Sequence, residues 1–340
     1  FLALFFSKAI AEPTFVQSYT YPTGAAAHKF NEFGLTFNND GTKMYIPADH
    51  EPNGTSDYVK EYTLTTAYDI STATVTATKL IFVSGTHESN KSVLPTQVVF
   101  NNDGTKMFTV NHTGHPTNPV PYVDYWSLST AFDLGSTVTL EGRYNISAQE
   151  IRANSIAFNN DGTKMFIAGV SNHNAEEDRI HEYSLATAFD LSSTVTHLNS
   201  EEMSSFHSYL DGITFNHDGT KMYTIDSTDN QISQFKLTTP YDVSTLSLEG
   251  TFDVSSVQEA PRQIAFSHDG SKMFFIVNTD NAATGKVHEF NLSCNWSVID
   301  GACDDPITTS DGGKDILSSI ESQTATAKQI AIQASTPVLN

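Results

Sequence analysis

The sequence predicts an all-β fold, a five-bladed β-propeller of four-stranded antiparallel blades that is closed by its own N-terminal strand and followed by a C-terminal helix. Nine residues, FNNDGTKMY at 37–45, return in near-identical form at 100–108, 158–166, 215–223 and 266–274. The same succession of short apolar segments surrounds each copy, which is typical of an array or a propeller. The last copy lacks its fourth segment, and a matching segment precedes the first copy.

Each copy contains an Asp-Gly pair that predicts a tight hairpin turn. Glycine accepts a positive φ, and the aspartate carboxylate can accept hydrogen bonds from the backbone amides that follow it. We therefore expect the aspartates to form turns, with calcium binding as the alternative. They are Asp40, Asp103, Asp161, Asp218 and Asp269, at successive spacings of 63, 58, 57 and 51 residues.

Four strands are predicted in each repeat. The first strand ends at the anchor phenylalanine that opens the motif, and it covers residues 34–37, 97–100, 155–158, 212–215 and 263–266. The second covers 43–48, 106–111, 164–169, 221–226 and 272–277. The third covers 58–64, 122–128, 179–185, 231–237 and 286–292. After a turn with an aromatic-Asp-aliphatic core, the fourth covers 78–84, 140–147, 197–204 and 247–255.

The second and third strands carry apolar residues on both faces. In the third strand of the first repeat, Val59 points to one face, whereas Tyr62 and Leu64 point to the other. A strand buried on both faces lies between two sheets, and a ring of blades provides this environment. A β-helix would repeat at a shorter period, and a two-sheet sandwich would not need five copies of one sequence.

The two ends of the repeat region predict how the ring closes. No fourth strand follows Val298 in the fifth copy. The segment at 15–24 precedes the first motif instead, and Tyr19 stands 18 residues before Phe37, as the corresponding residue does in the second repeat. We therefore expect this segment to pair with the third strand of the last repeat, which would remove an exposed sheet edge.

The motif F-[NS]-x-D-G-[TS]-K-[ML]-[YF], which all five copies fit, resembles the repeats of secreted bacterial β-propeller proteins of the lactonase-like and YVTN-like kind. The resemblance covers residues 14–298. It implies the fold and export from the cell. It does not imply one activity, because propellers serve as lectins, hydrolases, lyases and scaffolds.

The N-terminal residues predict an exported protein. Residues 1–11 contain the apolar run LALFFSKAIA and end in small residues, which is typical of the remnant of a secretory signal peptide cleaved after Ala11. A buried N-terminal strand is the alternative, and the run is too short to span a bilayer. In an exported chain, Cys294 and Cys303 are expected to form one disulfide, with two free thiols as the alternative.

The chain after the signal-peptide remnant divides into a propeller, a linker and a C-terminal tail. We assign residues 12–303 to the propeller, 304–313 to a linker, and 314–340 to a helix and tail with one mildly apolar face. The helix resembles the linker helix that precedes the outer-membrane barrel of autotransporter-type proteins. That resemblance implies that the propeller is a displayed passenger, secreted or at the outer membrane. A helix packed on the propeller, or a frayed tail, is the alternative.

The net charge of the chain disfavours negatively charged binding partners. Its formal net charge is −21. Such a surface repels phosphate, so we expect no nucleic-acid partner and no attraction to anionic membrane. Cations, neutral glycans and basic peptides remain open as partners, and the acidity also serves solubility.

The two faces of the ring differ in the sequence. The turn face, as we call it, carries the connections between first and second strands and between third and fourth strands, where the NDGTK and YDIST turns are alike in the copies. The variable face carries the other two connections, which differ strongly. Loops on a rigid scaffold commonly carry function, so the variable face is the expected site of binding.

Polar residues gather on the variable face near the mouth of the central channel. Four residues before each anchor phenylalanine stand Phe33, Thr96, Asn154, Asp211 and Arg262. Paired donors and acceptors of this kind suit a sugar or another small polar ligand. A solvated channel mouth in which Asp211 and Arg262 balance each other is the alternative. The predicted ligand-binding residues are His28, Arg152, Asn154, His207, Asp211 and Arg262.

No metal or cofactor site is predicted. His112 and His115 are three residues apart, and His173 precedes the acidic residues 176–178, but no such spacing repeats in the other loops. Calcium remains an alternative on the Asp- and Asn-rich loops, because hard oxygen donors are plentiful there.

The sequence gives less support to catalysis than to binding. It contains no nucleophile elbow, phosphate-binding loop, dinucleotide fingerprint or HExxH helix. The inward carboxylates are Asp211, Glu150 and Glu259, and no catalytic residue is assigned among them. We predict an extracellular or cell-surface binding or adhesion module whose partner is a glycan, a small polar ligand or a surface protein. A hydrolase or lyase acting on a polysaccharide or lactone in the same funnel, and a structural spacer, are the alternatives.

Overall fold

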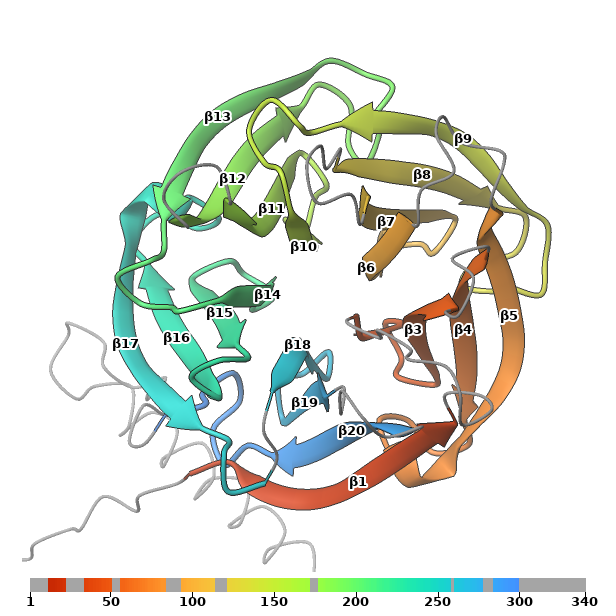
Figure 1. The fold of residues 1–340 in the computed structure, drawn as a ribbon. Helices are drawn as coiled ribbons and strands as arrows, with labels where there is room; N and C mark the ends of the chain where they lie inside the picture. Colours follow the sequence, from red (N-terminus) through yellow and green to blue (C-terminus); the bar gives the residue numbers. More distant parts are fainter. Residues whose placement is uncertain are drawn as a thin grey trace, which may run out of the picture. The chain divides into compact units, whose positions relative to one another are not determined.

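Five four-stranded antiparallel sheets surround a central axis in the computed structural model (Figure 1). The structure describes residues 12–22, 34–50, 56–83, 93–113, 121–171, 177–257, 260–277 and 284–299. The predicted signal-peptide remnant, linker and C-terminal helix lie outside these residues and stay predictions. Within the described ranges, no helix is long and apolar enough to cross a membrane.

Each blade contributes one strand to each of four concentric positions. The innermost strands are β2 (Thr36–Phe37), β6 (Val93–Phe100), β10 (Ala153–Phe158), β14 (Leu210–Phe215) and β18 (Pro261–Phe266). The second strands are β3 (Lys43–His50), β7 (Lys106–Thr113), β11 (Lys164–Ser171), β15 (Lys221–Asp226) and β19 (Lys272–Val277). The third strands are β4 (Ser56–Leu64), β8 (Tyr122–Leu128), β12 (Glu177–Leu185), β16 (Gln231–Leu237) and β20 (Thr284–Asn291).

The outermost strands form the rim of the ring. They are β5 (Ala73–Val83), β9 (Val138–Asn145), β13 (Val195–Glu202), β17 (Leu246–Asp253) and β1 (Thr14–Pro22). Four of them begin a few residues before the predicted fourth strand, directly after the YDIST-type turn. Two of these turns contain one turn of 3₁₀-helix, η1 (Ile70–Thr72) and η2 (Val243–Thr245), which the aspartate before each one caps.

The predicted closure of the ring is confirmed. Strand β1 pairs antiparallel with β20, with Phe15 opposite Phe290 and Tyr21 opposite Gly285. The fifth sheet therefore has the order β1-β20-β19-β18, in which the first strand of the chain is the outermost strand of the last blade (Figure 1). We number the blades 1 to 5 from β2–β5 to this closing sheet.

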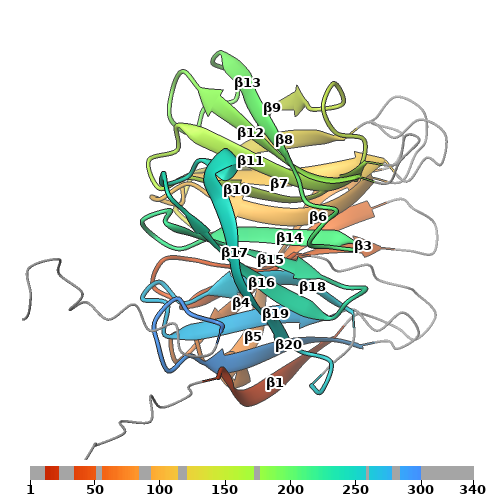
Figure 2. The same cartoon turned by 90° about the vertical axis from the view of Figure 1, so that its left-hand side faces the viewer.

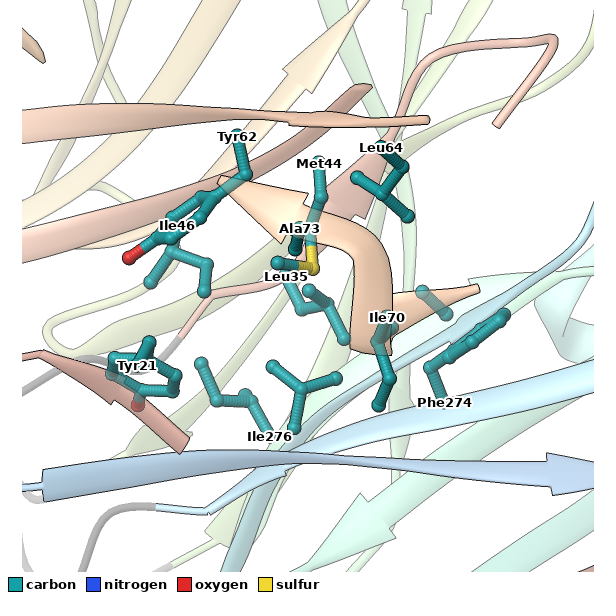
Figure 3. Packing of buried hydrophobic residues seen from close by; sticks show 12 residues of the cluster. Tyr21, Leu35, Met44, Ile46, Tyr62, Leu64, Ile70, Ala73, Phe274 and Ile276 are labelled. Carbon is teal, nitrogen blue, oxygen red and sulfur yellow. The ribbon is translucent and has the colours of Figure 1, made fainter. Parts of the chain in front are cut away.

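The hydrophobic core is divided into five clusters, each at an interface between two blades. In the closing interface, Phe274 and Ile276 of blade 5 face Met44, Ile46 and other residues of blade 1 (Figure 3). All four of these side chains are fully buried. The second and third strands are thus buried on both faces, as the sequence predicts.

The turn aspartates act as turn formers, as expected. In the first copy Asp40 Oδ1 accepts hydrogen bonds from the Thr42 backbone N–H at 2.9 Å and from its hydroxyl at 2.6 Å. These bonds lower the pKa of Asp40, since they stabilise its ionised form. The next residue, Gly41, has a φ of +71°, a conformation that glycine adopts readily.

An aromatic residue of the same blade covers each turn glycine. A Cβ at Gly162 would meet the ring of Phe189 at 2.1 Å, and the other four copies are equally crowded. Phe189 itself has a φ of +52°, which is uncommon for a bulky residue. The anchor phenylalanine of the blade, Phe158, packs between Phe189 and Phe108 of the preceding blade, with ring centroids 5.3 and 4.7 Å apart.

A lysine of each blade donates to the backbone carbonyl of this left-handed aromatic residue in the next blade. We call this contact the blade clasp. It also crosses the closing interface, because Lys272 of blade 5 donates to Tyr68 of blade 1. The five Nζ–O pairs are Lys43–Phe132 at 2.7 Å, Lys106–Phe189 at 2.9 Å, Lys164–Tyr241 at 2.7 Å, Lys221–Trp296 at 3.4 Å and Lys272–Tyr68 at 3.0 Å.

A buried glutamate supports the clasp in blades 1, 3 and 5. In blade 3 Glu182 pairs with Lys164 at 2.6 Å, and its other oxygen accepts the Val243 N–H of blade 4 at 3.3 Å. Blade 2 has Tyr125 at the equivalent strand position, opposite Phe108. Seen from the side, the strands of all blades run between the two faces of the ring (Figure 2). The clasps lie near the turn face, because their acceptors belong to the YDIST-type turns.

We expect the loss of a clasp lysine to destabilise blade 3 more than blade 2. Lys164→Met leaves Glu182 buried without its counter-ion, which costs about 3 kcal/mol, at the low end for buried pairs because Lys164 is 28% exposed. Lys106→Met, the matched control, removes only a hydrogen bond to a carbonyl and costs about 1 kcal/mol. Urea unfolding measures both, and equal losses would contradict the role given to Glu182.

Substitution of a turn glycine should also be destabilising. Gly162→Ala places a Cβ against the Phe189 ring and in a left-handed backbone, and we expect a loss of about 2–4 kcal/mol. Gly135→Ala is the control, because Gly135 lies exposed in a turn and the nearest atom to its Cβ is 3.1 Å away; it should change stability by less than about 0.5 kcal/mol. Similar melting temperatures for the two variants would show that the ring contact is not constraining.

Candidate functional site

Four of the residues predicted near the channel mouth occupy the same special position in successive blades. Thr96, Asn154, Asp211 and Arg262 are each the extra residue of a β-bulge in an innermost strand, where the pairing with the second strand shifts by one. Bulges are frequent beside functional sites because they redirect a side chain. The equivalent of these residues in blade 1, Phe33, lies outside the described part of the chain.

The bulge residues are tied to the neighbouring blade. Thr96 Oγ1 donates to the Ala153 carbonyl at 3.2 Å, and Asn154 Nδ2 donates to the Leu210 carbonyl at 2.9 Å. Arg262 Nη1 donates to Asp211 Oδ1 of the preceding blade at 3.0 Å. These ties hold the bulge side chains in place along the wall of the channel. We call the four residues the bulge ring.

Asp211 and Arg262 form an ion pair at the variable face. Asp211 is buried, and its second oxygen accepts the Ser227 backbone N–H at 2.9 Å. Burial raises the pKa of Asp211 to about 6, although Arg262 and the Ser227 bonds act in the opposite direction. The Arg262 side chain is 18% exposed and also contacts the Ser227 hydroxyl at 3.2 Å. The pair thus fixes a partly exposed guanidinium on a buried carboxylate.

His207 supports a loop and does not join the bulge ring. Its Nε2 lies 2.7 Å from Thr224 Oγ1, and its Nδ1 lies 3.7 Å from Asp226 Oδ2. Burial lowers the pKa of His207 to about 4, so the ring is neutral at pH 7. The Asp226 carboxylate in turn accepts hydrogen bonds from two connecting segments of blade 4. One comes from the Ser208 backbone N–H, before β14, and one from the Thr228 backbone N–H, between β15 and β16.

A buried carboxylate that the sequence indicates only as one of the acidic residues 176–178, and not as a ligand-binding residue, lies near Asp211. Asp178, at the start of β12, accepts the Leu210 backbone N–H at 3.1 Å. Burial raises its pKa to about 7, and the negative charges of Asp226, Asp211 and Glu150 act in the same direction. A carboxylic acid with a pKa near 7 is a common feature of functional sites.

The other predicted site residues are placed as follows. Arg152 is partly exposed, and its backbone N–H is bonded to Glu150. Glu150 is fully buried and does not face the channel mouth, since its second oxygen lies near His181. His28 and Glu259 lie outside the described residues, so their assignments stay predictions. No free cysteine is found in the described ranges, and Cys303, the predicted disulfide partner of Cys294, lies outside them.

The turn face holds a cavity of about 280 Å³ around the channel axis. The anchor phenylalanines line it together with the two residues that follow each of them, which are two asparagines in blades 1 to 3, Asn216 and His217 in blade 4, and Ser267 and His268 in blade 5. At its rim Asn39 donates to the Asn102 carbonyl and Asn102 to the Asn160 carbonyl, both at 2.6 Å. Hydrogen bonds from these side chains thus connect the turns of neighbouring blades on the turn face.

The described residues contain no group of three or more His, Cys, Asp or Glu side chains that could hold a metal ion. Several of the loops rich in Asp and Asn, including 51–55, 172–176 and 278–283, lie outside the described ranges. The calcium alternative therefore stays open.

Comparisons with known proteins support the fold and do not identify a family. No protein-family model and no curated protein sequence matches the chain. Among solved structures, a GH43_1 enzyme from Xanthomonas citri complexed with xylose is 9% identical with a TM-score of 0.51, and the match covers 83% of this chain and 92% of that one. At such identity the likeness concerns the fold alone.

Two further structures match with lower scores. A luciferin-regenerating enzyme is 14% identical with a TM-score of 0.45, over 81% of this chain and 95% of that chain. A 6-phosphogluconolactonase-like protein from Bacteroides fragilis is 14% identical with a TM-score of 0.42, over 78% and 69%.

The raised pKa of Asp178 predicts a pH-dependent stability. Between its unfolded pKa of 3.8 and its folded pKa of about 7, the folded state binds more protons than the unfolded state, so stability falls as the pH rises. Asp178→Asn removes the group that titrates, and with it this loss of stability at higher pH. Relative to the wild type, the variant should gain about 2–4 kcal/mol between pH 4 and pH 7.5, as measured by urea unfolding.

His207 provides the control of opposite sign. Its folded pKa of about 4 lies below the unfolded 6.5, so the unfolded state binds more protons in this window and stability rises with pH. His207→Gln should therefore lose stability relative to the wild type as the pH rises from 4 to 6.5. An Asp178→Asn curve that runs parallel to the wild-type curve would contradict the assignment to Asp178.

Proposed function

We propose that this propeller is a binding module whose variable face holds a neutral glycan, or another small molecule rich in hydroxyl groups, at the mouth of the central channel. The observation that carries the proposal is the bulge ring. Equivalent β-bulges in four blades bring Thr96, Asn154, Asp211 and Arg262 to the same register position of the innermost strands. Such a repeated departure from regular pairing is typical of a functional position.

The chemistry of the ring favours a hydroxylated ligand. A hydroxyl, an amide, a carboxylate and a guanidinium follow one another around the wall, and each is held by bonds to a neighbouring blade. Preorganised donors and acceptors lower the entropy lost on binding. The net charge of −21 disfavours a polyanion, so a neutral sugar fits better than an acidic one.

The cellular setting belongs to the same proposal. The apolar run at 2–11 and the resemblance to secreted propeller repeats support export, and the segment at 314–340 supports display at the outer membrane as the passenger of an autotransporter-type protein. In that setting, binding of a surface glycan or a surface protein amounts to adhesion.

A hydrolase or lyase at the same face is the second candidate. The observation that favours it is the pair of raised pKa values, about 7 for Asp178 and about 6 for Asp211. A buried carboxylic acid that keeps its proton near neutral pH can act as a general acid toward a glycosidic or lactone oxygen. A spacer without ligand is the third candidate and would leave the bulge ring without a function.

A glycan array that includes xylose and neutral xylo-oligosaccharides tests the proposal, followed by calorimetry on the strongest hit. We expect Arg262→Gln and Asn154→Ala to weaken binding about tenfold or more, because each removes a hydrogen bond to the ligand. His268→Ala on the turn face is the control and should bind as the wild type does.

The outcomes separate the three candidates. Binding without product release supports a binding module, whereas product release supports the hydrolase or lyase. Unchanged affinity of both bulge-ring variants would reject the channel mouth as the site. No binding to any glycan or small polar ligand would leave the spacer.

A further inference from the structure

A serine on the rim of blade 3 lies between two imidazole rings. Ser200, on the outermost strand β13, has its Oγ 2.7 Å from His181 Nδ1 and 3.0 Å from His197 Nε2. His181 belongs to the neighbouring strand β12, directly opposite Ser200 in the antiparallel pairing. Ser200 is partly exposed, whereas His181 is buried, so a reagent can reach the hydroxyl from outside the ring.

A buried carboxylate lies behind His181. Glu150 is fully buried, and its Oε1 accepts the backbone N–H groups of Ile151 at 2.7 Å and Arg152 at 3.0 Å. Its Oε2 lies 3.5 Å from His181 Nε2. Neither of these two buried atoms has another hydrogen-bond partner among the described residues. The 3.5 Å contact between them is longer than an ordinary hydrogen bond, and it brings a carboxylate oxygen to the imidazole nitrogen that faces away from Ser200.

One assignment of protons satisfies every group in this cluster. An ionised carboxylate only accepts, so His181 Nε2 carries the proton that faces Glu150. His181 Nδ1 is then the acceptor and takes the hydroxyl proton of Ser200. His197 Nε2 donates to the same Ser200 oxygen. Burial and the proximity of His181 lower the pKa of His197, in keeping with a neutral ring.

We propose that Ser200 is a nucleophile, with His181 as its general base and Glu150 as the residue that positions His181, in a site that accepts acyl or phosphonyl groups from activated esters. A hydroxyl, an imidazole and a carboxylate in sequence are the arrangement by which unrelated enzymes activate serine. This site lies on the rim of the propeller and is independent of ligand binding at the bulge ring.

The covalent step is an ester exchange. Ser200 Oγ bonds to the carbonyl carbon of the ester while its proton passes to His181 Nδ1. The bond between that carbon and the leaving oxygen then breaks, and the leaving oxygen takes the proton from His181. With a fluorophosphonate, the Oγ–P bond forms, the P–F bond breaks, and the proton and fluoride leave as hydrogen fluoride.

Blade 5 contains a matched control. Ser18, on the outermost strand β1, lies opposite His288 of β20 with its Oγ 2.8 Å from His288 Nδ1. No hydrogen-bond partner is found for His288 Nε2 in the described part of the chain, and its ring stacks on Phe275 at 5.0 Å. Ser18 is also more exposed than Ser200. The greater exposure of Ser18 would make Ser18 react faster with a reagent, whereas the carboxylate behind His181 would make Ser200 react faster.

Labelling of the full chain with a fluorophosphonate, followed by peptide mass spectrometry, tests the proposal. We expect Ser200 to be modified about 100-fold faster than Ser18 in the same molecule, because both serines have a histidine at hydrogen-bond distance but only His181 has a carboxylate behind it. Ser200→Ala should abolish this modification. Equal rates at Ser18 and Ser200, or no modification of Ser200, would overturn the proposal without any variant having to fold.

The positioning role of Glu150 has its own test. Glu150→Gln keeps an oxygen for the two backbone N–H groups but removes the charge beside His181. We expect labelling of Ser200 to fall at least about tenfold, and NMR to show the Nε2–H tautomer of His181 in the wild type only. An unchanged labelling rate in a variant with native circular dichroism would overturn the role of Glu150.

Discussion

The blade clasp is the contact on which the rest of this structure depends. Its acceptor is the carbonyl of an aromatic residue held in a left-handed conformation, which a bulky side chain adopts only when its surroundings enforce it. Two neighbours enforce it here. The turn glycine has no side chain and so leaves room for the aromatic ring, and the anchor phenylalanine packs against that ring. The glycine, the phenylalanine and the lysine of the nine-residue motif therefore act as one unit, completed by the aromatic residue of the following turn. Because the clasp from Lys272 to Tyr68 is equivalent to the other four, the last blade closes on the first with no special device beyond the N-terminal strand.

The clasp divides the chemistry of the two faces. On the turn face, an altered side chain disturbs both its own blade and the next, so the copies stay alike and their polar groups bond to one another. On the variable face, the innermost strands leave the shared pattern through bulges, and the side chain at the bulge differs in every described blade. The buried carboxylates Asp178, Asp211 and Asp226 are gathered at that end of blades 3 and 4, where backbone N–H groups satisfy them. The repeated contacts of the turn face thus hold the blades together, and the variable face can carry a different side chain in each blade.

The blade count and the closing strand could be predicted from the sequence, because a hairpin turn has a local signature and a missing strand can be counted. The clasp could not, since its acceptor is a backbone atom 75 to 89 residues away in the first four blades. Counting back from the anchor phenylalanine found Asn154, Asp211 and Arg262, although it gave no sign that they are bulged. His207 shows the limit of such counting, because its contacts with Thr224 and Asp226 depend on how the following strands fold back on it. The cluster around Ser200 was missed because it depends on the register of two strands, although the pairing of His with Ser in blades 3 and 5 was a signal.

The rim can carry chemistry for the same reason as the variable face. In the third strand of each blade, the residue before the position of Glu182 varies between the copies, and only blades 3 and 5 share a residue type there: the five residues are Lys60, Asp124, His181, Ser233 and His288. No clasp depends on that residue, so the copies are free to diverge there. In blade 3 the divergence brings an imidazole beneath a rim serine and a loop carboxylate behind the imidazole. The same blade supplies Asn154 to the bulge ring from β10, and the strands β11 and β12 separate it from Ser200 on β13. A binding site on the channel wall and a reactive serine on the rim can therefore occupy one blade without sharing a residue.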